Sequence, residues 1–523
     1  MSSTDRITLK YRLILVLPAL TGVGIILVST SRYGAGLSPD SAEYISIARN
    51  LMKGVGFVLL DGSPLTLWPP LYPALLGALA LVFGIDPLLS AHIVNAFLFG
   101  CIVYLSGLLF FKHLTPPVAF ALLGITSVLL SPPLIEVSLM AWSEPLFICL
   151  VLLFLIFSEA YVAQGDITSL LLLSLAVSLA CLTKTGGPVL ILMGAVNILL
   201  YRRGILKHKL AHLLLFMFVS IFFISIWMIR TYLVSGALIG KRLSSGYTLF
   251  QNIHDVFNTI VSWYIPESIA AHQSILILLS AGFCVLMGTG LRFLWKNQRA
   301  VSIRMLPAML FTVFYPAFLI ISSTIVAYDK IGSRILSPVF VPANLLALTF
   351  FLAVFKPIAG RIFSERAHIF LIASIALFLM HPAVLTLSHI AAHLRYGGEG
   401  YNSKLWRESE TIQYLREHRN FGASSTVYSN DPPAVYLWAD VSAKLIPFRL
   451  FRSVNFKQYH GQKRENNVLR LKGTWPPEGQ AYLVWFDKFD DSWNVSIDEI
   501  GTIASIERIA RLKDGAVYAV ARR

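Results

Sequence analysis

Charged residues are scarce in this chain. Of its 523 residues only 14% are Asp, Glu, Lys or Arg, whereas a soluble domain typically carries about a quarter. The hydrophobic share is 56%, and apolar runs of about 17 residues or more recur before residue 391. These runs exclude an ordinary soluble globular protein and predict a polytopic membrane protein.

Cysteines are few, and basic residues outnumber acidic ones. The four cysteines all fall in apolar segments without metal-ligand spacing, so neither a disulfide framework nor a cysteine metal site is expected. The net charge is +15, but most of the positive charge lies in short loops between apolar runs, as the positive-inside rule requires. This distribution argues against nucleic acid as a partner.

The basic loops also predict the topology. The N-terminus and residues 201–209, 292–304 and 356–366 are all rich in Lys and Arg and are expected on the cytoplasmic side. An even number of crossings must then precede residue 201, so the Pro-containing apolar run 65–84 is predicted to lie at the outer surface. About eleven spans result, namely 12–31, 88–111, 116–135, 144–163, 168–184, 186–202, 210–230, 274–295, 304–326, 335–355 and 367–390.

Composition changes after residue 390. Residues 391–523 are more polar, with a helix-like run at 404–418 and strand-like runs at 425–429, 481–486 and 516–521. Alternating helix and strand signals predict a small α/β domain on the outer side. We therefore expect two parts, a transmembrane part at 1–390 and an extracytoplasmic domain at 391–523.

The outer ends of the predicted spans carry ionisable residues, whereas the middles of the spans carry few. Asp40 follows Ser38, a suitable N-cap, and Pro39, a suitable first helical residue, and it opens a predicted amphipathic surface helix over 40–53. An acid at that position also complements the helix dipole without any catalytic role. Ion-coupled transporters usually place their charges near the midplane of the membrane, so charges at the rim favour an enzyme.

Three cations are expected on the same outer side, each near the end of a different span. They are Lys184, Arg230 and Arg334. Any one of them can simply reach lipid phosphates from a span end, but three together favour a phosphate-binding site. Glu144, which opens an apolar run directly after Ser143, is either an interfacial helix-start acid or a second functional carboxylate.

Several short motifs resemble membrane glycosyltransferases of the GT-C class. The resemblance is greatest to the family 39 group, which includes protein O-mannosyltransferases and the lipid A aminoarabinose transferases. It covers about residues 10–350. The motifs are Asp40 after the first span, Ala48-Arg49-Asn50-Leu51, Trp68-Pro69-Pro70-Leu71-Tyr72-Pro73, Ser143-Glu144-Pro145, Leu182-Thr183-Lys184, the run from Trp227 to Arg230, and Arg334-Ile335-Leu336-Ser337-Pro338.

The resemblance implies an inverting sugar transfer from a polyprenyl-phosphate donor to an acceptor hydroxyl on the extracytoplasmic face. In that reading Asp40 is the general base and Glu144 a second catalytic carboxylate. Lys184, Arg230 and Arg334 stabilise the departing phosphate. Glu43, Tyr44 and Tyr72 are expected to contact substrate.

Partners, cofactors and location follow from the same reading. No cofactor is certain, but Asp40 and Glu144 are the candidate ligands if a divalent metal takes part. The expected partners are the polyprenyl-phosphate sugar, a glycan, lipid or protein acceptor, and membrane lipid. The expected location is the cell membrane (inner or plasma membrane), with a cytoplasmic N-terminus. The alternative function is a lipid or sugar transporter or flippase without transferase chemistry.

Overall fold

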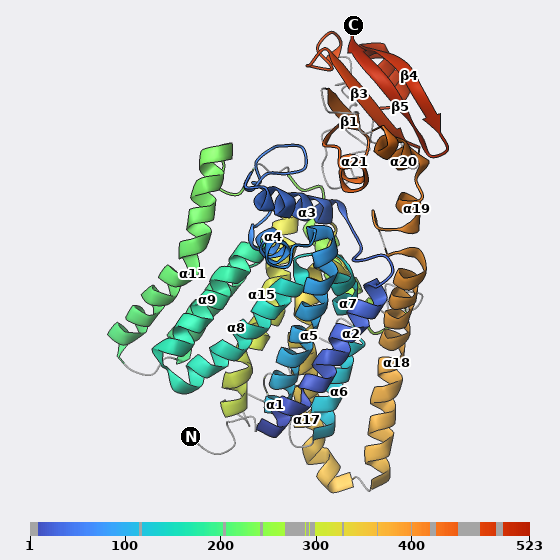
Figure 1. The fold of residues 1–523 in the computed structure, drawn as a ribbon. Coiled ribbons are helices and arrows are strands. Elements are labelled where there is room, and N and C mark those ends of the chain that lie inside the picture. Colours follow the sequence, from blue (N-terminus) through green and yellow to red (C-terminus); the bar gives the residue numbers. More distant parts are fainter. Residues whose placement is uncertain are drawn as a thin grey trace.

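The computed structural model describes most of the chain. The described residues are 9–114, 118–201, 205–240, 244–266, 288, 292, 299–326, 329–362, 365–398, 400–418, 425–447, 471–487 and 495–523. They form a helical bundle that carries a small sheet domain at one end (Figure 1). Helix α3 (Pro39–Met52) lies across this same end of the bundle, which we call the α3 end, whereas helix α1 (Leu9–Ile14) lies at the opposite end.

The bundle is built from long apolar helices. Its described members are α1 (Leu9–Ile14), α2 (Val16–Thr30), α5 (Pro87–Leu114), α6 (Val118–Leu129), α7 (Pro132–Leu139), α8 (Glu144–Gln164), α9 (Ile167–Thr183), α10 (Pro188–Tyr201), α11 (Leu206–Ser235), α15 (Arg299–Ile325), α17 (Phe340–Ile362) and α18 (Glu365–Tyr396). The short helix α16 (Ser333–Leu336) and a 3-10 turn (Ser337–Val339) lead into α17.

Within the described residues, six helices are long and apolar enough to cross a membrane, or seven if the bent pair α6 and α7 forms one span. This confirms a polytopic membrane protein, but the predicted number of spans remains a prediction. The predicted spans 168–184 and 186–202 correspond to α9 and α10, which are apolar but shorter. The predicted span 274–295 falls outside the described residues, and 367–390 lies within α18.

Two helices follow α2 before the next long helix begins. They are α3 (Pro39–Met52) and α4 (Leu71–Phe83), which pack against each other. Helix α4 has 13 residues, too few for a span, in agreement with a surface position for the run 65–84. Its end is marked by Gly84, whose φ of 65° is the left-handed conformation that glycine adopts without strain.

A glycine-lined contact joins α2 to α5. A Cβ added at Gly100 of α5 would lie 2.5 Å from Val23 Cγ2 and 3.1 Å from the carbonyl oxygen of Ala19, both on α2. Small residues let helices in a membrane approach closely, so that dispersion contacts and backbone proximity replace the missing hydrophobic driving force. This contact fixes α2, the helix that precedes α3 in the chain.

The C-terminal domain holds a five-stranded sheet in the order β2-β1-β3-β5-β4. Strands β1 (Thr426–Ser429), β2 (Ala443–Leu445) and β3 (Gln480–Phe486) are parallel. Strand β5 (Gly515–Arg522) pairs antiparallel with β3, and the edge strand β4 (Ala504–Leu512) pairs antiparallel with β5. Helices α19 (Lys404–Arg407), α20 (Glu410–Glu417), α21 (Pro432–Ala439) and α22 (Ile497–Ile503) complete it. The predicted α/β class is confirmed; the predicted division at residue 390 falls within α18.

We predict that Gly100→Val destabilises the protein by about 1–3 kcal/mol, because added methyl groups would overpack the contact with α2. Thermal unfolding in detergent measures the effect. Gly24→Val on α2 is the matched control, since a Cβ at Gly24 meets nothing within 4 Å. Equal losses in both variants would show that the close α2–α5 approach is not what the glycine preserves.

Candidate functional site

The start of α3 places Asp40 in the first helical turn. Ser38 is the N-cap: its Oγ accepts from the N–H of Ser41 (3.3 Å), and the Ser41 hydroxyl accepts in return from the N–H of Ser38 (3.1 Å). This capping box and Pro39 fix where the helix begins. The predicted roles of Ser38 and Pro39 are therefore confirmed, and the Asp40 carboxylate projects from a rigid turn.

Glu144 opens α8 and is completely buried. One of its oxygens, Oε1, accepts from Lys184 Nζ at 2.5 Å and from Arg334 Nε at 2.7 Å. The other oxygen, Oε2, has no hydrogen-bond partner among the described residues. A buried carboxylate is costly unless cations compensate it, so Glu144 depends on these two partners.

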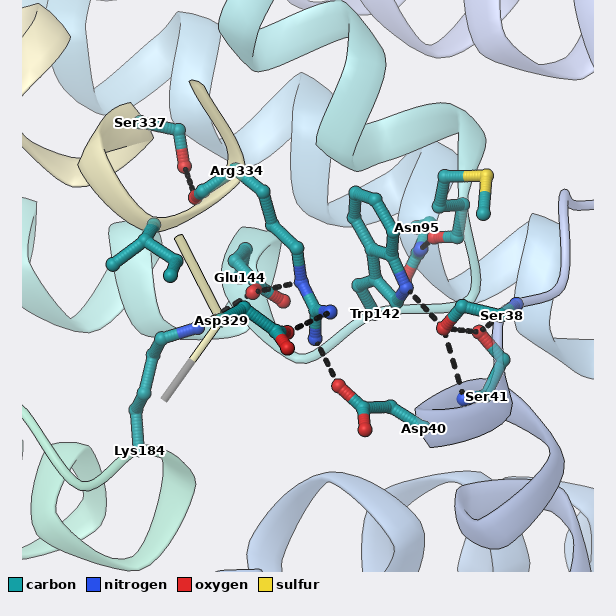
Figure 2. Close-up of polar contacts among 12 residues, drawn as sticks. Ser38, Asp40, Ser41, Asn95, Trp142, Glu144, Lys184, Asp329, Arg334 and Ser337 are labelled. Atoms are coloured by element: carbon teal, nitrogen blue, oxygen red, sulfur yellow. Dashed lines mark hydrogen bonds and ion pairs between the residues drawn. The ribbon is translucent and has the colours of Figure 1, made fainter. Parts of the chain in front are cut away.

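Arg334 connects this buried pair to Asp40 (Figure 2). Its Nη2 donates to Asp40 Oδ2 at 2.6 Å, while its Nε donates to Glu144. The guanidinium also lies over the ring of Trp142, 4.2 Å from the ring centroid, and its Nη1 is 3.9 Å from Asp329 Oδ2. Two carboxylates from different helices are thus held by one planar cation, a geometry that arginine provides and lysine does not.

Trp142 links the cation to the helix start. Its Nε1 donates to Ser38 Oγ at 2.7 Å, so the ring that faces Arg334 also binds the N-cap of α3. The sequence analysis missed this residue, because a single Trp beside an apolar run looks like a core or interfacial residue. Its place directly before Ser143-Glu144 is the only sequence signal that could have indicated it.

Four of the predicted site residues therefore come together. Asp40, Glu144, Lys184 and Arg334 form one network, contributed by α3, α8, the residue that follows α9, and α16. We call these four residues the charge network. The side chains of Lys184 and Arg334 are 17% and 19% exposed, so solvent or a ligand can reach them.

Arg230, the third predicted cation, lies elsewhere. Its guanidinium donates to the carbonyl oxygens of Leu65 and Phe57 and lies 4.8 Å from the centroid of the Trp227 ring. The structure thus uses Arg230 to hold the loop between α3 and α4. Its predicted role at the donor phosphate is not supported by any contact with the charge network among the described residues.

The three predicted substrate contacts differ in their surroundings. Glu43 accepts from the N–H of Leu60 at 3.2 Å. Burial raises the pKa of the Glu43 carboxyl to about 7, opposed by this N–H and reinforced by the charges of Asp61 and Asp40. Tyr44 and Tyr72 are buried and pack edge to face at 5.3 Å. Their contact with substrate stays a prediction.

The same geometry tests the suggested metal. Hard divalent cations are bound by several oxygen ligands, but the guanidinium of Arg334 already lies between Asp40 and Glu144. In the described part of the chain, no group of three or more His, Cys, Asp or Glu side chains is arranged to hold a metal ion. The side chain of Arg334 thus lies where a metal bridging the two carboxylates would have to bind, and these residues do not fit a divalent metal.

We predict that Glu43 gives the stability a pH dependence near neutrality. The folded protein holds the Glu43 proton up to about pH 7, whereas an unfolded chain releases it near pH 4.5, so stability should fall as the pH rises through this window. Glu43→Gln mimics the protonated side chain. Its melting temperature should match wild type at pH 4.5 and exceed it at pH 8. A constant difference across this range would contradict the prediction.

Comparison with solved structures finds similar folds among membrane glycosyltransferases. ArnT from Cupriavidus metallidurans aligns with a TM-score of 0.61 and 13% identity over 97% of both chains, and an undecaprenyl phosphate-bound structure of it with 0.58. An Archaeoglobus fulgidus oligosaccharyltransferase aligns at 0.53 with 12% identity, over 83% of this chain and 62% of its own. The arabinofuranosyltransferase AftD from Mycobacteria aligns at 0.55 with 13% identity, over 99% of this chain and 40% of its own.

This chain thus spans less than two thirds of the length of the latter two proteins. No protein-family model matches the sequence, and no curated protein matches it in a sequence comparison. At such low identities the likeness shows the fold alone. The chain has the fold of the GT-C class of glycosyltransferases, a membrane helical bundle with a small C-terminal α/β domain.

Proposed function

We propose that this protein is a membrane glycosyltransferase that moves a sugar from a polyprenyl-phosphate donor to an acceptor hydroxyl, with inversion. The observation that carries the proposal is the charge network, in which an accessible acid and a buried acid share one guanidinium beside a lysine. Undecaprenyl phosphate bound to ArnT and dolichol phosphate bound to the oligosaccharyltransferase AglB support a lipid-linked donor.

Asp40 is the proposed general base. Its Oδ2 is held by Arg334, and among the described residues no hydrogen bond reaches its Oδ1. The side chain is 25% exposed. As the acceptor oxygen attacks the anomeric carbon, its proton passes to Asp40, the new C–O bond forms, and the bond from the anomeric carbon to the phosphate oxygen breaks. Fixing one carboxylate oxygen orients the other toward the acceptor.

Lys184 and Arg334 are proposed to stabilise the phosphate as its negative charge grows. Arg334 uses two of its five N–H groups on the carboxylates and Lys184 uses one of its three. The remaining donors can bind phosphate oxygens without breaking the network. Because these cations are already in place before reaction, little reorganisation is needed when the leaving group departs.

Glu144 is proposed to serve both parts of the donor, its phosphate and its sugar. Its Oε1 holds the two cations at a fixed separation, and its buried Oε2 still needs a donor. An unpaired buried carboxylate oxygen is unfavourable, and a sugar hydroxyl would satisfy it. Glu144 would then bind the transferred sugar rather than move a proton.

The proposed orientation puts the charge network and residues 391–523 on the extracytoplasmic face of the cell membrane, and the N-terminus in the cytoplasm. The α3 end, which holds both the network and the sheet domain, lies opposite α1, the first described helix, in Figure 1. The alternative, a transporter or flippase, is less well supported, because the described network lies at one end of the bundle and not at its middle.

We predict that Asp40→Asn lowers kcat by about 10²–10⁴-fold while the donor still binds, because the amide cannot accept the proton. The assay is transfer from a panel of polyprenyl-phosphate sugars, with binding measured separately. Asp61→Asn is the control, because Asp61 is an exposed acid in the loop between α3 and α4, where its carboxylate accepts hydrogen bonds from Ser63. Wild-type protein that neither binds nor turns over any such donor would refute the transferase proposal, and transport without transfer would support the alternative.

We predict that Lys184→Gln raises the KM for the donor about tenfold or more, since a hydrogen bond to a charged group contributes about 1.5–3 kcal/mol. Glutamine can still donate to Glu144, so the buried acid keeps a partner. Lys53→Gln is the matched control, because Lys53 is an exposed cation at the far end of α3. An unchanged KM for the donor in Lys184→Gln would remove Lys184 from the phosphate site.

A further inference from the structure

The segment between α2 and α3 is bound along its whole length. All five carbonyl oxygens from residue 33 to residue 37 accept a hydrogen bond. The donors are Arg407 Nη2 to Tyr33 (2.6 Å), His393 Nε2 to Gly34 (3.0 Å), Asn402 Nδ2 to Ala35 (2.6 Å), the Ala141 N–H to Gly36 (2.9 Å) and the Tyr401 N–H to Leu37 (2.8 Å). Four of these five donors come from the region that joins α18 to the sheet domain.

We call these four residues, His393, Tyr401, Asn402 and Arg407, the C-terminal clamp. Asn402 is its centre: it is buried, and its Oδ1 accepts from Arg407 Nε (3.1 Å) and Nη2 (2.5 Å) while its Nδ2 donates to Ala35. Arg407 therefore orients Asn402 and binds the segment itself. Its guanidinium also lies 4.9 Å from the ring centroid of Trp438, which ties the clamp to α21.

The two backbones touch at Gly400. A Cβ at this position would lie 1.8 Å from the carbonyl oxygen of Leu37, and the φ of Gly400 is +79°. Only glycine allows such an approach. Leu37 directly precedes Ser38, the N-cap of α3, so the clamp ends where the helix that carries Asp40 begins.

The opposite side of the segment is held by the membrane part of the protein. Gly36 exchanges hydrogen bonds with the 139–141 turn, and Trp142 binds Ser38. A backbone fixed from both sides cannot shift without carrying the first turn of α3 with it. In the part of the chain that the structure describes, Arg334 and Lys184 make no hydrogen bond or ion pair with the clamp; they lie on α16 and at the end of α9.

We infer that the C-terminal clamp is a positioning device for catalysis: Asn402 and Arg407 fix the 33–37 segment and thereby hold the Asp40 carboxylate at its reacting distance. This assigns the junction of the C-terminal domain a role in the chemical step and rests on the proposed function of Asp40. A displacement of about 1 Å at a catalytic group can reduce the rate by about 10²-fold, so a few hydrogen bonds suffice for such a role.

The test is Asn402→Asp in the full-length protein. Aspartate keeps the size of the side chain and an oxygen for Arg407, but it loses the N–H donor to Ala35. We expect kcat to fall about tenfold with the KM for the donor unchanged, because the phosphate-binding cations are held elsewhere. Lys404→Ala is the control: Lys404 is the first residue of α19, close in sequence to Asn402, and its exposed ion pair with Glu408 is 3.6 Å long.

A double-mutant cycle separates positioning from general destabilisation. Asp40→Glu also misplaces the carboxylate, so its loss in kcat should not multiply with that of Asn402→Asp if both act on the same atom position. Losses that multiply, with equal melting temperatures, would overturn the positioning role. Restoring one donor with Arg407→Lys should recover part of the kcat lost in Arg407→Ala.

Hydrogen exchange gives a readout that does not need turnover. Peptides covering residues 33–41 should exchange faster in Asn402→Asp than in wild type, while peptides of α8 should not change. Unchanged exchange over 33–41 would overturn the clamp even if the enzyme proved inactive with every donor. Wild-type turnover that survives undiminished in Asn402→Asp would overturn the clamp and leave the proposed function intact.

Discussion

The guanidinium of Arg334 is the contact on which the rest of the site depends. Glu144 is fully buried, and a buried carboxylate without compensating cations would destabilise the fold by several kcal/mol. Arg334 and Lys184 supply that compensation, and Arg334 extends it to Asp40 at 2.6 Å. Three helices and the end of a fourth are thereby brought to one point, so the stability of the bundle and the geometry of the site share the same interaction.

The network is also suited to the chemistry proposed for it. Each cation keeps unused N–H donors, Asp40 keeps an open oxygen, and Glu144 keeps a buried oxygen without a partner among the described residues. In this site the charges of the two carboxylates and the two cations compensate one another. It can therefore bind a phosphate and a sugar without the desolvation cost of an uncompensated buried charge. The C-terminal clamp and Trp142 then hold the segment that leads into α3 from two sides.

Much of the fold could be read from the residues. Ser38 and Pro39 predict the start of α3, since a capping hydroxyl and a fixed φ act locally. The strand-like runs at 425–429, 481–486 and 516–521 match β1, β3 and β5, because their apolar and β-branched residues are mostly buried. Two strands were not predicted. Strand β2 has only three residues and carries too little pattern, and β4 interrupts its apolar residues with Glu507, Arg508 and Arg511. The short motifs and the predicted outer placement of their charged residues also indicated Asp40, Glu144, Lys184 and Arg334.

The sequence by itself determined that the chain is a membrane bundle with a polar α/β domain, because hydropathy and helix-start chemistry depend only on neighbouring residues. Only the tertiary structure decided which charges meet. Lys184 and Arg334 bind Glu144, whereas Arg230 turns to backbone carbonyls of Leu65 and Phe57. The clamp joins residues more than 350 positions apart, for instance Ala35 and Asn402. Such pairings depend on how helices pack in space, and no local pattern records them.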